Sequence, residues 1–326
     1  MHVLVIGSSV IDLFLALDQD HFKLQDKNVE LLLGDKIPSQ IQGHAIGGNG
    51  ANVSVGLTKL EIPTTFYTYL GSDFFSREIE NGLSSQGVEL DTERHPEGAS
   101  PLHLILDFPG DRIIISNYGK NEHNFNPREQ KYDYIFLTSI PDIWEEAYKK
   151  ILSYSKENNI PIAFSPGTRQ IEDKNELTLE VIKNSKAYFS NKEEAMKILN
   201  YESGSMNQGE DKDLIKKLLI GFKELGVETV SITDGANGAY AADKNGDMYH
   251  INPAPTEGKE KTGAGDAYAS GFFGAILTGL DTPTAMLWGA LNADNKMQKI
   301  GAENGLLTKK ELDEKTKSNN LEAVKI

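Results

Sequence analysis

The sequence contains no cysteine among its 326 residues. A disulfide framework, a thiolate nucleophile and a zinc site built on cysteine are therefore excluded. Basic residues are also scarce, because 33 Lys and Arg stand against 48 Asp and Glu, a formal net charge of −15. A surface with this excess of negative charge repels nucleic acid and anionic membranes. We therefore expect no nucleic-acid partner, and a bound phosphate would have to be held by backbone dipoles and a metal ion.

Long apolar segments are missing as well. The longest apolar stretch, residues 3–17, is interrupted by Gly7, two serines and Asp12, whereas a membrane span needs about 20 mostly apolar residues. The first residues lack the basic region and the small-residue cleavage site of a secretory signal. We therefore expect no membrane partner and a cytoplasmic location. The sequence also lacks the G-x-S-x-G, H-E-x-x-H and Walker A motifs, and its 7 histidines show no metal-ligand spacing.

What the sequence does contain is an alternation of short apolar runs with longer amphipathic segments. The runs are rich in β-branched and aromatic residues and lack a polar face, as in a parallel sheet covered on both sides. They lie at residues 3–6, 65–70, 134–137, 161–164, 187–189 and 229–232. Predicted helices lie at 50–60, 74–86, 143–157, 192–199, 213–225, 264–277 and 284–298, with a short polar helix and a frayed tail after Lys309. This pattern predicts an α/β fold, a three-layer α/β/α sandwich around a mostly parallel, doubly wound sheet.

Two regions break this alternation. Residues 11–18 and 30–33 have strand patterns with no helix between them, and 101–107 and 112–118 flank the turn residues Pro109-Gly110. Four antiparallel strands, two from each region, would form a small separate sheet. That sheet could serve as a lid over a ligand cleft or as a homodimer contact, and the two uses are compatible. We predict a main domain of residues 1–10, 48–95 and 122–326 and a β-sheet lid of residues 11–47 and 96–121.

The segment Lys261-Thr-Gly-Ala-Gly-Asp266 opens the predicted helix 264–277. Gly263 and Gly265 permit backbone angles that a side chain would forbid. The first N–H groups of a helix lack internal partners, and its dipole adds about half a positive charge there, so this segment would form an anion cradle. Asp266 would oppose a phosphate in that cradle unless it accepts a proton beside the phosphoryl group. The alternative is an ordinary first-turn Asp behind a glycine turn.

A second glycine-rich segment, Gly47-Gly-Asn-Gly-Ala-Asn52, opens another predicted helix. Its glycines allow a small ligand to approach the backbone, while Asn49 and Asn52 offer neutral donors and acceptors that suit hydroxyl groups. The alternative is a turn in which Asn49 caps the helix. Asp12 is a lone carboxylate in an apolar run, and such a group is costly to bury unless it is paired or faces a ligand. It could grip two hydroxyl groups of a polyol, or lie exposed at the edge of the lid.

Two further motifs follow predicted strands. Asn191 and Glu194 are three residues apart at a helix start, where they could hold Mg²⁺ through water or form an N-cap with a capping box. The segment Thr233-Asp-Gly-Ala-Asn-Gly238 is a turn between two strands. Beside a nucleotide this turn would approach the phosphates.

The order of these motifs resembles that of the ribokinase-like (PfkB) carbohydrate kinase family, over residues 2 to 310. The resemblance implies a ribokinase-like domain with a β-sheet lid, ATP and Mg²⁺, and a small sugar-like acceptor phosphorylated on a hydroxyl group, usually a primary one. By position it implies that Asp266 is the general base and that the anion hole consists of Gly263, Ala264, Gly265 and Asp266. The implied acceptor-binding residues are Asp12, Gly47, Gly48, Asn49 and Asn52. The implied ATP-binding residues are Asn191, Thr233, Gly235, Gly238 and Asn292, and the implied magnesium motif is Asn191 with Glu194.

The chain departs from the family pattern at two places. The family often has Asp-Thr-Thr before Gly-Ala-Gly-Asp, and that Asp often helps to hold a monovalent cation. This chain has Glu260, Lys261 and Thr262 there, so the resemblance does not carry potassium activation over to it. Asn49 stands where ribokinases proper tend to have Lys, so ribose is not implied as the acceptor.

Two other functions stay open. A nucleoside kinase of the same fold would place an aromatic stack in the lid, for which Phe14 and Tyr118 are candidates. A non-catalytic ligand-binding relative is the second alternative. The retained Asp266 and both neighbouring glycines argue against it, because a protein without catalysis need not keep the base.

Overall fold

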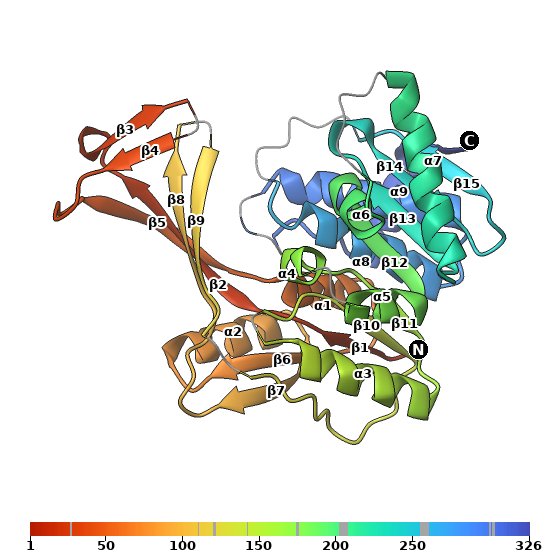
Figure 1. Ribbon diagram of the computed structural model, residues 1–326, viewed down its shortest axis with the longest axis horizontal. Helices are drawn as coiled ribbons and strands as arrows, with labels where there is room; N and C mark the ends of the chain where they lie inside the picture. The colour runs from red at the N-terminus through yellow and green to blue at the C-terminus, as the bar shows by residue number, and fades with distance from the viewer. Residues whose placement is uncertain are drawn as a thin grey trace.

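The computed structural model describes residues 1–26, 28–109, 111–119, 122–141, 143–173, 176–201, 208–254, 261–299, 301 and 304–326, and only the backbone of 208–211. At its centre lies a ten-stranded sheet (Figure 1). In spatial order its strands are β16 (Ala323–Lys325), β15 (Met248–Ile251), β14 (Ala239–Ala242), β13 (Thr229–Thr233), β12 (Ser185–Asn191), β11 (Ile162–Phe164), β10 (Tyr134–Leu137), β1 (Val3–Ile6), β6 (Thr64–Gly71) and β7 (Glu89–His95). Pairing is parallel from β13 to β7 and antiparallel from β16 to β13, which confirms the mostly parallel sheet.

Helices cover both faces of this sheet and complete three layers. One face carries α1 (Asn49–Lys59), α2 (Phe74–Ser85), α8 (Ala264–Leu277), α9 (Thr282–Met297) and α10 (Lys309–Ser318), and the other carries α3 (Glu145–Asn158), α4 (Thr168–Glu172), α5 (Glu176–Lys183), α6 (Lys192–Ile198) and α7 (Gln208–Glu224). The run Val3–Ile6 shows why a continuous apolar strand is needed. Val3 and Val5 pack into the first helical face, and Leu4 and Ile6 pack into the second. Among the described residues, no helix combines the length and apolar composition that crossing a membrane requires.

A second, four-stranded sheet stands off the main domain at the left of Figure 1. Its order is β5 (Ser39–Gly47), β2 (Val10–Leu17), β8 (Leu102–Phe108) and β9 (Asp111–Asn117), and a hairpin of β3 (Phe22–Gln25) and β4 (Asn28–Leu31) lies beside it, after the short helix η1 (Gln19–His21). As predicted, two strands come from each region. The predicted strand 30–33 overlaps β4, but β4 pairs with β3 outside this sheet, and β5 takes the expected place beside β2. The expectation of four antiparallel strands is wrong, because β2 and β8 pair in parallel. No apolar pattern marks β5, since most of its residues are exposed. Gly110 of the predicted turn lies outside the described residues.

The predicted frayed tail is also wrong, because β16 pairs antiparallel with β15 at one edge of the main sheet. The other edge strand, β7, was not predicted. Its sequence Glu-Leu-Asp-Thr-Glu-Arg-His is mostly polar, and its side chains are exposed or only partly buried. Edge strands of this kind need little apolar surface, so hydrophobic patterns miss them.

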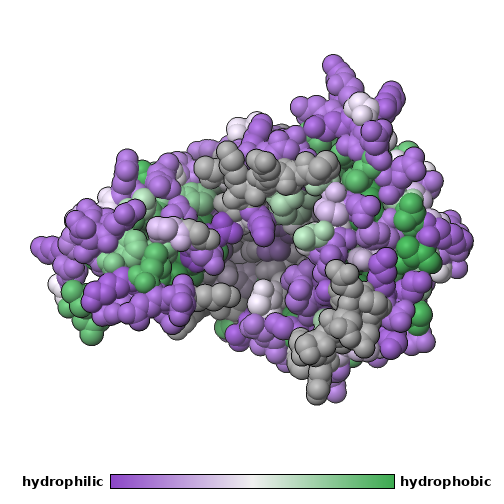
Figure 2. All heavy atoms as spheres, turned by 90° about the horizontal axis from the view of Figure 1, so that it is seen from above, coloured by the Kyte–Doolittle hydropathy of each residue, from purple (hydrophilic) through white to green (hydrophobic). Residues whose placement is uncertain are grey.

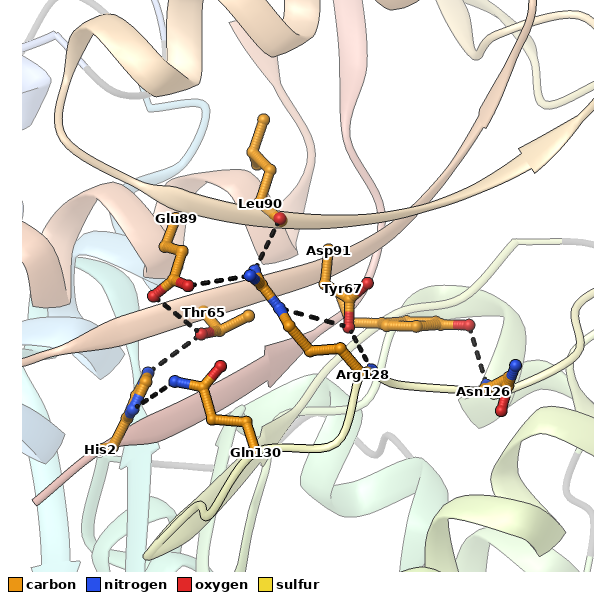
Figure 3. Close-up of polar contacts among 9 residues, drawn as sticks. All are labelled: His2, Thr65, Tyr67, Glu89, Leu90, Asp91, Asn126, Arg128 and Gln130. Atoms are coloured by element: carbon orange, nitrogen blue, oxygen red, sulfur yellow. Dashed lines mark hydrogen bonds and ion pairs between the residues drawn. The ribbon is translucent and has the colours of Figure 1, made fainter.

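Polar contacts tie the segment that returns from the lid to strand β7 (Figure 3). The Arg128 backbone N–H donates to the Asp91 carboxylate at 2.8 Å, and its guanidinium donates to the Leu90 carbonyl at 2.7 Å. The same guanidinium pairs with Glu89 at 2.9 Å. An uncovered edge strand is a template for pairing with another chain. These contacts therefore cover the edge and fix the chain where it leaves the lid.

Candidate active site

Asp266 lies in the first turn of α8, and both oxygens of its carboxylate are held by side chains of α1. The Asn52 amide donates to Oδ2 at 2.8 Å and the Asn49 amide donates to Oδ1 at 3.2 Å. Gly263, the residue before α8, adopts a left-handed conformation with φ 75°, which glycine adopts without strain. The two glycine-rich motifs therefore meet at one carboxylate, although they lie more than two hundred residues apart in sequence.

The environment of Asp266 raises the pKa of its carboxyl to about 6. Burial is the largest cause, and the two asparagine amides act against it because they stabilise the ionised form. The negative charge of Glu194 raises the pKa further, while the positive charge of Lys296 lowers it. The residue as a whole keeps some solvent exposure, while its carboxyl group is surrounded by protein atoms. A carboxylate with a pKa near neutrality is suited to accept a proton during catalysis.

The start of α8 offers an anion site next to this carboxylate. A Cβ added at Gly265 would meet no atom within 4 Å, so the space at this turn is open. The Ala264 N–H already donates to the Lys261 carbonyl at 3.1 Å. Ala264 belongs to the predicted anion hole, but its N–H group could bind an anion only if its hydrogen bond to the Lys261 carbonyl were broken. Glu260 lies outside the described residues.

Asp12 is buried on β2, an inner strand of the lid, with 4% of its surface exposed. The alternative of an exposed position at the lid edge is therefore wrong. Its Oδ1 lies 3.0 Å from Nδ1 of His103 on the neighbouring strand β8. A Cβ at Gly47 would lie 2.4 Å from Asp12 Oδ2, so glycine is needed there to leave room for the carboxylate. The next residue, Gly48, has φ 97° and would clash with the Ser8 carbonyl if it carried a Cβ.

The ends of β12 and β13 bring the other two motifs side by side. Asn191 and Thr233 are register partners at the carboxyl ends of these parallel strands. The turn after β13 contains the short helix η2 (Gly235–Asn237), and Gly238 has φ 85° with its Cβ position only 2.0 Å from the Ile251 carbonyl. Lys192 pairs with Asp234 at 3.0 Å. This ion pair ties the start of α6 to the turn, so the two motifs form one surface.

Asn191 and Glu194 form the predicted capping box of α6. The Asn191 side chain accepts from the Glu194 N–H at 2.8 Å, and the Glu194 side chain accepts from the Asn191 N–H at 2.9 Å. Burial is the largest cause that raises the pKa of Glu194, and its charge also acts on Asp266. A carboxylate whose negative charge raises the pKa of a neighbouring carboxyl favours a cation placed near both. Among the described residues there is no cluster of three or more acidic or histidine ligands, so most ligands of a metal here would come from nucleotide phosphates and water.

Asn292 contacts α8 at the residue after Asp266 and is fully buried. Its amide donates to the Ala267 carbonyl at 2.8 Å, and its Oδ1 accepts from the Leu307 N–H at 2.8 Å. Both ends of the side chain are thus engaged in joining α9 to α8 and to the loop before α10. This arrangement corrects the expectation of a position beside adenine, because a fully buried amide in such contacts braces the helices.

A side chain of the lid reaches the anion site. Arg112 on β9 donates to the Thr262 hydroxyl, one residue before the left-handed Gly263. Register places Asp12, His103 and Arg112 on the same face of the lid, because His103 is paired with Ser116, and Arg112 lies four residues before Ser116. Figure 2 shows the recess between the lid, at the left, and the main domain. The lid face that carries these polar groups is therefore the face turned toward the anion site.

Two residues of this site, His103 and Arg112, stand in no motif that the sequence analysis identified. His103 was one of several histidines without motif spacing, and only the parallel register of β2 and β8 brings it to Asp12. Arg112 was a single basic residue in a predicted hairpin. A search for charged residues on the predicted lid strands, at every second position, would have identified both as candidates.

Comparison with known proteins identifies the family. The family model for pfkB family carbohydrate kinases matches residues 2–309. The chain belongs to that family. It is 23% identical over 289 residues to the 5-dehydro-2-deoxygluconokinase of Bacillus subtilis, covering 82% of this chain and 86% of that protein. It is 26% identical over 274 residues to the nucleoside kinase of Methanocaldococcus jannaschii, covering 80% of this chain and 82% of that protein.

Solved structures agree in fold. A ribokinase of Arabidopsis thaliana, complexed with ribose and ATP, superposes with a TM-score of 0.77 at 19% identity, covering 96% of this chain and 97% of that chain. A ribokinase-family protein of E. coli, solved with ATP and Mg²⁺, gives a TM-score of 0.76 at 19% identity, covering 98% of this chain and 99% of that chain. The fold is therefore ribokinase-like, and this pfkB kinase is a phosphotransferase of the sugar and nucleoside kinase type.

Proposed function

We propose that this pfkB kinase transfers the γ-phosphoryl group of ATP to a hydroxyl group, a primary one, of a sugar or sugar derivative, with Asp266 as the general base. The observation that carries the proposal is the Asp266 carboxylate itself. It lies at a helix N-terminus, two amides hold its oxygens at 2.8 and 3.2 Å, and burial raises its pKa to about 6. A helix N-terminus attracts the phosphoryl group, and a carboxylate beside it is placed to take the proton of the attacking hydroxyl.

Phosphoryl transfer requires positioning and charge neutralisation more than covalent chemistry. Asp266 accepts the hydroxyl proton as the acceptor oxygen attacks, and the bond from the γ-phosphorus to the bridging oxygen of ADP breaks. The backbone N–H groups at the start of α8, including those of Gly265 and Asp266, stabilise the charge on the phosphoryl oxygens. Closure of the lid excludes water, which would otherwise compete as the nucleophile. The contact of Arg112 with Thr262 supports this assignment, because it links lid position to the anion site.

Glu194 and Asn191 fit a water-mediated Mg²⁺ site. The fit rests on the capping box, which fixes both side chains at the carboxyl end of β12, and on the negative charge of Glu194, which raises the pKa of Asp266. Bound Mg²⁺ would neutralise charge on the nucleotide phosphates. Thr233, Gly235 and Gly238 would border those phosphates, since their turn lies next to Asn191 and is fixed by the Lys192–Asp234 ion pair.

The acceptor would lie between the lid and the start of α1. Asp12 and His103 offer a hydrogen-bonded carboxylate and imidazole at the base of the lid, and Gly47, Gly48, Asn49 and Asn52 border them at and before the start of α1. A carboxylate next to a ring nitrogen can accept two vicinal hydroxyl groups in the manner sugars require. A nucleoside is the second candidate, because the Tyr118 ring lies edge-on against His103 at 5.6 Å and could stack a base.

An ADP-release assay with a panel of sugars, sugar acids and nucleosides tests this proposal. We expect magnesium-dependent ADP release with at least one sugar-like acceptor and loss of that release in Asp266→Asn. Release with nucleosides alone would select the second candidate. No release with any acceptor, from protein that binds ATP, would support a non-catalytic role and overturn the proposal.

We further propose that two copies of the chain associate through the outer face of the lid. Register places Ile41 and Ile113 on that face, on either side of Leu15 and Leu106. Ile41 is 66% exposed and Ile115, two residues beyond Ile113, is 51% exposed. An apolar sheet face of this kind is a common protein contact. Sedimentation analysis should show a dimer that Ile115→Glu dissociates, whereas an unchanged sedimentation profile would refute the contact.

A further inference from the structure

Lys296 on α9 is fully buried, with 0% of its surface exposed, and is among the largest fully buried side chains of the protein. Lysine is almost never fully buried without compensation, because removing an ammonium group from water is costly. Lys296 does contact other groups of the protein, and its positive charge also acts on Asp266 in the active site.

The packing of α9 against α8 shows where this lysine lies. A Cβ added at Gly271 of α8 would lie 2.9 Å from the Trp288 carbonyl oxygen and 3.1 Å from the Gly289 Cα, so α8 and α9 are in close contact there. One turn earlier in α8, the Ala267 carbonyl accepts from the Asn292 amide at 2.8 Å. The helices thus run antiparallel, and each turn toward the start of α8 corresponds to a turn toward the end of α9. One further turn brings Lys296 opposite Gly263 and Ala264, at the N-terminus of α8.

The electrostatics of Asp266 agree with this location. The positive charge of Lys296 acts on the Asp266 carboxyl and lowers its pKa, against the effects of burial and of Glu194. Such an influence requires the ammonium group to lie close to the site, since Coulomb interactions weaken with distance. Lys296 and the N–H groups of α8 therefore contribute positive potential to the same small region.

We propose that Lys296 is a built-in cation of the anion hole, whose ammonium group adds positive charge behind the N-terminus of α8 and strengthens the binding of the nucleotide phosphates. This inference rests on the proposed function, because it concerns the same phosphate site. Lys296 acts as a positioning residue, through the field it adds to the backbone N–H groups. Because the charge is carried by the chain itself, nucleotide binding should need no added monovalent cation.

A purely structural role is the competing explanation. Lys296 precedes the last residue of α9, Met297, and a cation near a helix C-terminus interacts favourably with the helix dipole. Removing such a lysine would change unfolding temperature and leave phosphate binding alone. Lys299 provides a matched control, because it is exposed and lies one turn beyond Lys296 at the same end of α9.

The test is calorimetric titration of ADP with Mg²⁺ into wild-type protein, Lys296→Met, Lys296→Gln and Lys299→Met. Each titration is made in potassium chloride and in tetramethylammonium chloride at equal ionic strength. We expect the wild-type Kd to be the same in both salts and to rise about tenfold in both Lys296 variants. The Lys299→Met variant should bind ADP like wild type. Lys296→Gln keeps a hydrogen-bond donor without the charge, so it remains informative if the methionine variant does not fold.

Two results would overturn the inference. One is a wild-type Kd for ADP that falls fivefold or more when potassium replaces tetramethylammonium. This comparison needs only the wild-type protein. The other is ADP binding in a folded Lys296 variant that equals wild type. Failure of the proposed function is a separate result, because it would appear as wild-type protein that binds ADP with Mg²⁺ and phosphorylates no acceptor.

Discussion

Replacing Asn52 by Ala should shift the pH dependence of turnover before it changes the maximal rate. The Asn52 amide donates to Asp266 at 2.8 Å, a shorter contact than the 3.2 Å of Asn49. A hydrogen bond to a charged group contributes about 1.5–3 kcal/mol, and one pKa unit corresponds to about 1.36 kcal/mol. Because the amide favours the ionised carboxylate, its loss should raise the pKa of Asp266 by roughly one to two units.

The effect on rate follows from the starting pKa of about 6. At pH 7 the wild-type carboxylate is about nine-tenths ionised, and in Asn52→Ala it would be about one-half to one-tenth ionised. Turnover at pH 7 should therefore fall about two- to tenfold and recover toward wild type near pH 9. Asn49→Ala should give a smaller shift in the same direction.

The assay is kcat and kcat/KM for ADP release between pH 5 and 9.5 at saturating ATP and Mg²⁺. Ser54→Ala is the control, because Ser54 is buried on the same helix and its hydroxyl donates to the Gly50 carbonyl at 2.7 Å, away from the carboxylate. A loss of rate in Asn52→Ala that is equal at every pH would refute the reasoning. It would mean that Asn52 acts only on the acceptor.

Three further outcomes are expected. Asp12→Ala should raise the KM for the acceptor far more than the KM for ATP, since an unpaired substrate hydroxyl costs about 1–3 kcal/mol, and equal changes in initial-rate kinetics would place Asp12 elsewhere. Lys192→Met should raise the KM for ATP by releasing the Asp234 turn, and an unchanged value would separate that turn from the nucleotide. Acceptor binding should increase hydrogen-exchange protection in the strands Val10–Leu17 and Asp111–Asn117 together, and unchanged exchange with acceptor bound would make the lid a static extension.

The buried layers of the fold were predictable because burial requires apolar residues, and these form recognisable patterns in the sequence. A strand covered on both faces, such as Val3–Ile6, must be apolar at every position, and both of its boundaries match the prediction. Strands β5 and β7 escaped prediction for the opposite reason. Each is largely exposed or partly buried, so neither needs an apolar pattern. Their place in the sheets depends on neighbours that are distant in sequence.

In the candidate site, too, some features follow from the local sequence and others depend on how distant segments pack. Asp266 and its glycines stand in one short segment, so the sequence predicts their grouping from local helix chemistry. The contacts of Asn49 and Asn52 with Asp266 join α1 to α8 and required the packing of these helices. The contact of His103 with Asp12 depends on the register of two strands, and the burial of Lys296 depends on the packing of α9 against α8. Neither could be predicted from the sequence nearby.

The central claim is that Asp266 is the base of a phosphoryl transfer, and Asp266→Asn tests it most directly. The substitution keeps the shape of the side chain and removes its capacity to accept a proton. Initial rates at saturating ATP and acceptor should fall about 10²–10⁴-fold, while the Kd for ATP with Mg²⁺, measured by calorimetry, stays close to wild type. A folded Asp266→Asn variant that keeps most of the wild-type turnover would contradict the account.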